Sequence, residues 1–225
     1  MVNPSSTQIL GFLQKVEDER GRRAADPGLA QRVLAVKRFQ QARLEASYSD
    51  LLASEGTAAA TRFFLDELYG PIDFSRRDAQ FVRIVPITVR LFPGALTNTL
   101  VGLAELHALS ERMDSEMALA VGGNTLDTTT YRAAWRHVGQ QIARRRQIEL
   151  VVRVGTALIG LTRSKILGTS LKALRAPAIK GGFSELHGFL QRGFDTFRTM
   201  SDSPGFIATL AAREQAFASS LFASV

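Results

Sequence analysis

The chain has 225 residues, enough for one large domain with a substantial core, and 45% of them are hydrophobic, which excludes an intrinsically disordered chain. The absence of cysteine excludes disulfides, cysteine-ligated zinc, iron–sulfur clusters and thiol nucleophiles. The formal net charge of +7 favours phosphate, nucleic acid or an acidic partner, but the charges are spread along the whole chain, as on an ordinary solvated surface.

The first 25 residues are polar and contain the basic run RGRR at residues 20–23. We interpret residues 1–25 as an N-terminal arm, partly flexible, because their apolar residues suffice only for a short amphipathic turn. The start lacks the long apolar run and the small-residue cleavage site of a secretory signal. The most apolar segment, residues 150–161, is too short to span a membrane and contains Arg153, so we expect a cytoplasmic protein without a membrane span.

The first helices after the arm are marked by their ends. Asp26-Pro27 predicts a helix start, because aspartate caps and proline fits the first helical position. Helical spacing of apolar residues continues to about residue 54, and a second helix is expected over 57–68. The next helix should begin at Ser75, and Pro86 should kink or split it by removing a backbone donor.

The second half of the chain is also helical in its patterns. Residues 94–121 predict an amphipathic helix that ends at the GGN sequence of residues 122–124, and Asp127 marks the next start. Residues 140–167 predict a long helix whose second half is apolar nearly all round, typical of a central helix or a subunit interface. We therefore predict an all-α fold, a single multi-helix bundle over residues 26–225 with about seven to nine helices, one of them Pro-kinked.

Two histidines are the first candidates for a ligand pocket. His107 and His187 lie on the apolar stripes of two different predicted helices, so they could line one pocket for haem or another small molecule. Neither follows the Glu-x-x-His spacing of di-iron bundles, since Ala104 and Ser184 stand three residues earlier. Hydrogen-bonded core histidines fit the pattern better, and no motif indicates a metal site or a cofactor.

Basic segments are the second kind of candidate. Arg144, Arg145 and Arg146 follow a glycine turn at Gly139, as in a helix-turn-helix, but Arg145 occupies a position that is often apolar in that motif. A solvated basic face explains this run better, so we do not expect nucleic-acid binding. The KGG sequence at residues 180–182 could receive an anion before a helix, although a flexible turn is the simpler interpretation.

The densest group of charges and aromatics is RFFLDELYGPIDFSRRD, residues 62–78. Its acids could form a charged cleft for acid–base chemistry, and the candidate residues there are Asp66, Glu67 and Tyr69. The same residues also suit a corner that ends one helix and starts another, which we favour over catalysis. Phosphate-binding loops and nucleophile elbows are absent from the sequence.

This stretch resembles the signature of an uncharacterised, mostly proteobacterial family of all-helical proteins, in which an FFL-x-x-LYGP-x-DF-x-x-RD run recurs. The sequence FRTMSDSPGFIATLAAREQAF at residues 197–217 resembles the C-terminal end of the same family. The resemblance covers most of the chain beyond the arm. It implies a helical fold and a domain of unknown function, and it brings no activity, substrate or cofactor.

The leading functional hypothesis is a non-enzymatic, soluble interaction protein that binds a protein partner or a small apolar ligand. A homodimer through the apolar half of the helix at 140–167 is one form of it. The first alternative is a small-molecule or haem-binding protein, including an enzyme, with its pocket near His107 and His187. The second is nucleic-acid binding through the basic helix start at residues 144–146.

Overall fold

The computed structural model describes residues 3–68, 70–91, 94–123 and 126–222. These ranges contain twelve α-helices, one π-helical turn and no strand, which confirms the all-α prediction. There are more helices than predicted, because local breaks divide segments that the apolar pattern alone treats as continuous.

The elements follow one another with short connections. In chain order they are α1 (Pro4–Ala25), α2 (Pro27–Ser47), α3 (Ser49–Ala53), α4 (Ala58–Phe63), the π-helix η1 (Phe64–Leu68), α5 (Ser75–Leu91), α6 (Ala95–Val121), α7 (Thr128–Val138), α8 (Gln141–Thr162), α9 (Lys165–Ala173), α10 (Arg175–Lys180), α11 (Ser184–Thr199) and α12 (Ser203–Phe222).

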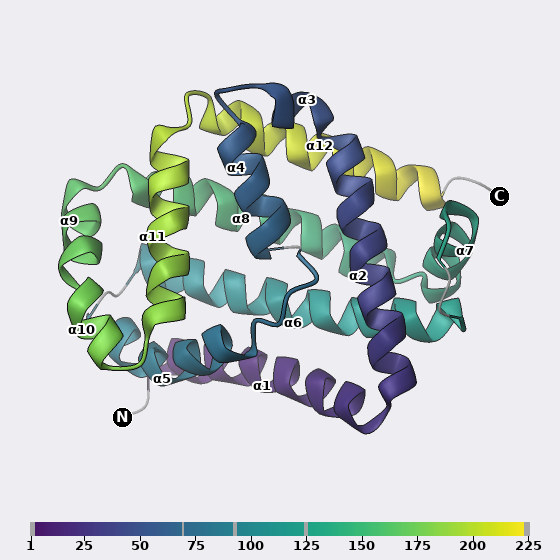
Figure 1. Cartoon of the computed structure of the whole chain (residues 1–225), viewed down its shortest axis with the longest axis horizontal. Coiled ribbons are helices and arrows are strands. Elements are labelled where there is room, and N and C mark those ends of the chain that lie inside the picture. The colour runs from purple at the N-terminus through teal and green to yellow at the C-terminus, as the bar shows by residue number, and fades with distance from the viewer. Residues whose placement is uncertain (1–2, 69, 92–93, 124–125, 223–225) are drawn as a thin grey trace.

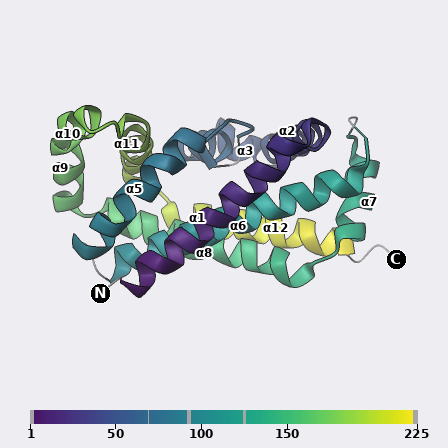
Figure 2. The ribbon, with the colours of Figure 1, turned by 90° about the horizontal axis from the view of Figure 1, so that it is seen from below.

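The helices are arranged in two layers. Four long helices lie side by side in the order α1, α6, α8, α12, and Figure 1 shows them running along the long axis of the molecule. The helices α2, α4 and α11 cross this layer, and the turned view in Figure 2 shows α2, α3 and α11 on one side of it. The short helices α9 and α10 form one end of the molecule, and α7 lies at the other (Figure 1).

Several predicted helix ends are confirmed. The side chain of Asp26 accepts a hydrogen bond from the backbone N–H of Leu29 at 3.0 Å, so it caps α2. Asp127 caps α7 in the same way, and α6 ends at Gly122 in the left-handed conformation. Pro86 lies inside α5, which continues to Leu91 and is not split.

The N-terminal region differs from the expected weakly docked arm. Residues 4–25 form one helix of 22 residues that packs along α6. Its apolar residues Ile9, Leu13 and Val16 recur with helical spacing and are at most 3% exposed. The rest of this segment is mostly polar, so its composition alone does not indicate that one apolar stripe is fully buried.

Helix α8 is central, one of the two placements that its apolar pattern predicted, but it ends at Thr162 and not near residue 167. The break has a local cause, because the Ser164 side chain accepts a hydrogen bond from the N–H of Leu167 and starts α9. Its apolar half packs against α6, α11 and α12. Most of the face that the sequence offered for a dimer is therefore covered within the chain.

Candidate functional site

A row of polar side chains on α6 faces α1, α2 and α5 and is largely buried. It contains His107, Glu111 and Asp114, spaced so that they lie along one side of the helix. Together with their charged partners they form what we call the buried charge layer: Arg20, Arg23, Lys37, Asp78, His107, Glu111 and Asp114.

Glu111 is the most heavily paired carboxylate of this layer. Its side chain contacts the guanidinium of Arg23 on α1, and one oxygen lies 2.6 Å from Nζ of Lys37 on α2. Burial would raise the pKa of Glu111, but the charges of Lys37 and Arg23 outweigh it and lower the pKa to about 2. Arg23 also donates to the Glu111 carbonyl and to Ser115 Oγ, so three helices are joined here.

Asp78, from the first turn of α5, binds the other end of the layer. Its Oδ2 lies 2.5 Å from the Arg20 guanidinium and 2.8 Å from Nε2 of His107. Burial would raise the pKa of Asp78, but its contacts with His107 and Arg20 leave the pKa below its ordinary value. Because an ionised carboxylate only accepts hydrogen bonds, this geometry places a proton on Nε2 of His107.

Asp114 behaves differently within the same layer. It accepts a hydrogen bond from Gln40 at 3.2 Å, but Lys37 lies 3.9 Å away and is shared with Glu111. Burial therefore dominates and raises the pKa of Asp114. The layer as a whole binds charges to one another across helices, an arrangement that holds helices in register.

The corner at residues 62–78 is assembled by similar pairings. The Arg77 guanidinium lies between the rings of Phe74 and Phe189, 3.9 Å and 4.4 Å from their centres, and donates to the carbonyl of Glu67 at 3.1 Å. Asp73 accepts a hydrogen bond from the backbone N–H of Ser75, which caps α5. These contacts give the aromatic and charged residues of this stretch structural roles.

The three candidate residues of this corner have separate surroundings. Glu67 forms an ion pair with Arg192 of α11 at 2.7 Å, and Asp66 is exposed, with Gln41 at 3.5 Å. Tyr69 lies outside the described residues. The chain makes a π-helical turn here, a local insertion that often occurs at functional sites. A Cβ at Gly70 would lie 2.3 Å from the Asp66 carbonyl oxygen, so this position has no room for a side chain.

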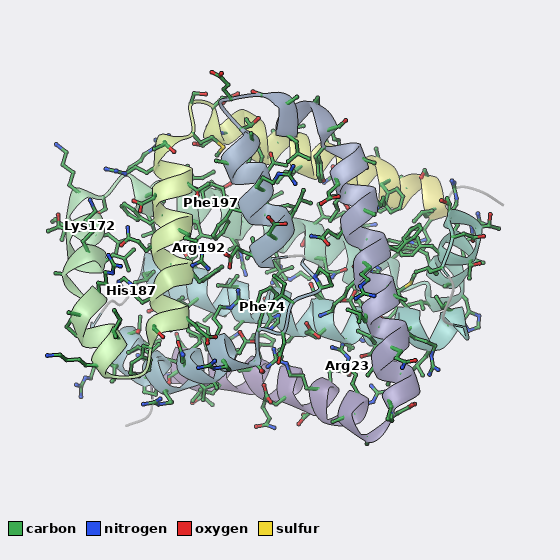
Figure 3. The ribbon with its side chains drawn as sticks, in the orientation of Figure 1. Arg23, Phe74, Lys172, His187, Arg192 and Phe197 are labelled. Atoms are coloured by element: carbon green, nitrogen blue, oxygen red, sulfur yellow. The ribbon has the colours of Figure 1, made fainter. Side chains whose placement is uncertain are left out.

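The structure gives the two histidines different partners. His107 binds Asp78, between α5 and α6, whereas Nε2 of His187 donates to the carbonyl of Leu171 on α9 at 2.8 Å. Figure 3 shows His187 among α9, α10 and α11, apart from Arg23 and its part of the buried charge layer. Within the described ranges, no three His, Asp or Glu side chains are grouped so that they could hold a metal ion.

Two hollows of the surface are considered as ligand sites, and neither is lined by His107 or His187. One of about 100 Å³ lies where α8 meets the end of α11, beside Phe197, which Figure 3 labels. The other, of about 330 Å³, is open to solvent and lies beside Leu119 and His137, where the ends of α6 and α7 meet. The first is smaller than the roughly 300 Å³ or more that small-molecule pockets occupy.

The three candidate arginines of α8 have three different environments. Arg144 is buried, with its guanidinium 3.8 Å from the centre of the Trp135 ring. Arg146 donates to Glu105 at 2.7 Å, and Arg145 is exposed. They do not present one basic face to a nucleic acid.

The segment that sequence analysis passed over is the pair of short helices α9 and α10. Lys165, Lys172, Arg175 and Lys180 are all exposed, and none forms an ion pair with a described residue. Between them, Ile166 is 81%, Ile179 57% and Leu174 52% exposed. We call these seven residues the basic–apolar corner: Lys165, Ile166, Lys172, Leu174, Arg175, Ile179 and Lys180.

The basic–apolar corner rests on a firm base. A Cβ at Gly168 would lie 2.8 Å from the Phe194 ring, so α9 and α11 approach closely at this glycine. The bond from His187 to Leu171 ties the same two helices together. Figure 3 shows Lys172 at the edge of the molecule, beyond these contacts.

The sequence contains a signal for this surface, because residues 150–184 include no Asp or Glu while carrying six Lys or Arg. Three of the five lysines of the chain fall between residues 165 and 180. The net charge of the whole chain does not reveal this local excess of lysine and arginine over acidic residues. The buried charge layer has no such signal, since its partners are as many as 88 residues apart.

Comparison with known proteins gives a family and no function. Residues 19–225 match a family described as a domain of unknown function (DUF8198). No curated protein and no solved structure matches the chain. Among the helices of the described residues, none has the length and apolar character needed to cross a membrane.

Proposed function

The chain belongs to the DUF8198 family, and we propose that it is a non-enzymatic interaction protein that binds a negatively charged, partly apolar partner through the basic–apolar corner. The supporting observation is that 16 consecutive residues, 165–180, contain three exposed aliphatic side chains and four cations that form no ion pair with any described residue. Exposed apolar side chains that form one patch favour a surface that another molecule covers.

The cations of the buried charge layer differ from those of the corner. Lys37, Arg23 and Arg20 each have a carboxylate within the chain. The cations of the basic–apolar corner have no carboxylate partner among the described residues, so their charge is available to a partner without first breaking an ion pair there.

The character of the corner favours this function over the alternatives. No aromatic residue lies between residues 163 and 182, so the corner offers no aromatic ring that would stack on bases, and its aliphatic side chains have no role against a phosphate backbone. A pocket for haem or a small molecule near His107 and His187 has less support, because each ring binds a different partner and neither ring lines one of these two hollows.

Self-association is a second candidate, and its surface differs from the one that the sequence suggested. The apolar half of α8 is mostly covered, but Ile142 at its start is 83% exposed and Leu119 on α6 is 50% exposed beside the open hollow. A homodimer would use this end. Size-exclusion chromatography with light scattering tests it, and a strict monomer at high concentration removes it.

The main proposal is tested by retention of the whole chain on immobilised polyglutamate over a salt gradient. We expect retention that falls with salt and is lost in the corner variant K165Q/K172Q/K180Q. The matched control is R38Q/R62Q/R145Q, which removes three exposed arginines and changes the net charge equally. Equal retention of the two variants would mean that only total charge matters and would overturn the proposal.

A further inference from the structure

Resting on the proposed function, we propose that the partner of the basic–apolar corner is the surface of an anionic lipid bilayer. The headgroup phosphates would contact Lys165, Lys172, Arg175 and Lys180, and the side chains of Ile166, Leu174 and Ile179 would enter the interface between headgroups and acyl chains.

The shape of the corner favours a bilayer over a protein. Its aliphatic side chains are exposed on the two short helices that form one end of the molecule (Figure 1), and neither of the two hollows is lined by any of its seven residues. Peptide partners usually dock into a groove that holds their anchoring side chains. A bilayer has no fixed shape to match, so it accepts protruding side chains without a groove.

The chemistry of the corner points the same way. Three of its four cations are lysines, whose flexible stems can lie along apolar material while the ammonium group reaches the headgroups. No acidic residue within 150–184 would repel the phosphates. Basic residues around exposed aliphatic ones are the composition of surfaces that lie on anionic membranes without crossing them.

The contacts between α9 and α11 favour insertion of the exposed aliphatic side chains. Because Gly168 packs against Phe194 and His187 binds Leu171, the inner side of α9 is fixed to α11. Ile166 therefore faces outward without an internal position to fold back into, and its exposed state is built into the fold. A fixed surface loses less conformational freedom on binding than a mobile one.

The test is cosedimentation of the whole chain with vesicles of phosphatidylcholine alone or mixed with phosphatidylglycerol. We expect binding to the anionic vesicles only, weakening as salt increases. The variant K165Q/K172Q/K180Q should bind about 100-fold more weakly, since each cation contributes roughly five-fold near an anionic surface. The control R38Q/R62Q/R145Q should change binding by a few-fold at most.

Apolar insertion is tested separately. I166S/I179S keeps every charge and should weaken vesicle binding by about 10-fold without changing its dependence on salt. In I166W, the new tryptophan should shift its emission to the blue when anionic vesicles are added, while Trp135, only 7% exposed, supplies a constant background.

The outcomes separate this inference from the function on which it rests. Retention on polyglutamate without binding to anionic vesicles would leave the proposed anionic partner standing and overturn the lipid inference alone. Loss of both would overturn both. Equal binding to neutral and anionic vesicles, or an unshifted I166W emission with bound vesicles, would also contradict insertion of a basic–apolar corner.

Discussion

Lys37 and Lys172 show two uses of the same side chain. Lys37 is part of the buried charge layer, 2.6 Å from Glu111, and joins α2 to α6. Lys172 lies at the edge of the molecule among exposed aliphatic residues, with no ion pair among the described residues. A net charge of +7 treats them alike, so composition is a poor guide to where a partner binds.

The two lysines differ in their solvation and in their partners. In the buried charge layer, water has been removed and each charge depends on its neighbours, so losing one partner leaves others unpaired in a poorly solvated place. In the basic–apolar corner, water solvates the cations and the unfavourable exposure belongs to the aliphatic residues. The two regions should therefore respond in opposite ways to substitution.

The largest effect is expected from Glu111→Gln. The change leaves the half-buried side chains of Arg23 and Lys37 without the Glu111 carboxylate, and we expect a loss of about 3 kcal/mol in the free energy of unfolding. Urea denaturation measures it. Asp50→Asn is the control, because its ion pair with Arg213 is largely exposed and should contribute far less to stability than the Glu111 pairs. Similar losses in both variants would remove the distinction between buried and exposed pairs.

Acid should weaken the buried charge layer next. The pKa of Glu111 is about 2 in the folded chain and 4.5 ordinarily, so its pairing stabilises the fold fully above pH 4.5. This stability, on the order of 3 kcal/mol, is lost as the pH falls from 4.5 towards 2. The pH dependence of the free energy of unfolding measures it, with Glu111→Gln as the reference that lacks this component. A wild-type curve parallel to that of the variant would contradict the pairing.

The smallest effect on stability is expected in the corner. K165Q/K172Q/K180Q removes three exposed cations without ion pairs, so the free energy of unfolding should change by at most about 0.5 kcal/mol. The same variant is expected to lose binding. A destabilisation of several kcal/mol would show that these lysines support the fold, and the contrast between the two regions would disappear.

Local signals predicted much of the fold. Asp26, Gly122 and Asp127 end or start helices through contacts within a few residues, so the sequence alone could indicate them. The docking of α1 could not be predicted in the same way, because it depends on the face that α6 presents about 90 residues later. An apolar stripe shows that a helix can be buried, but not that a matching surface exists.

The candidate sites illustrate the same limit. His107 lies on the predicted stripe, yet its partner Asp78 belongs to a different helix, 29 residues away, and only the tertiary structure joins them. Arg144, Arg145 and Arg146 are adjacent in sequence and separate in environment, because successive residues on a helix point about 100° apart. The residues of the basic–apolar corner are candidates because they are exposed, and their exposure depends on how α9 packs on α11.

The placement of α9 and α10 at one end of the long axis has a consequence for orientation. A protein that touches a bilayer through that end stands on it, with α1, α6, α8 and α12 steep to the membrane plane (Figure 1). The open hollow beside Leu119 and His137, and the end of α12, then point away from the lipid. In this orientation, a molecule bound at the α7 end would be held at a fixed distance from the membrane.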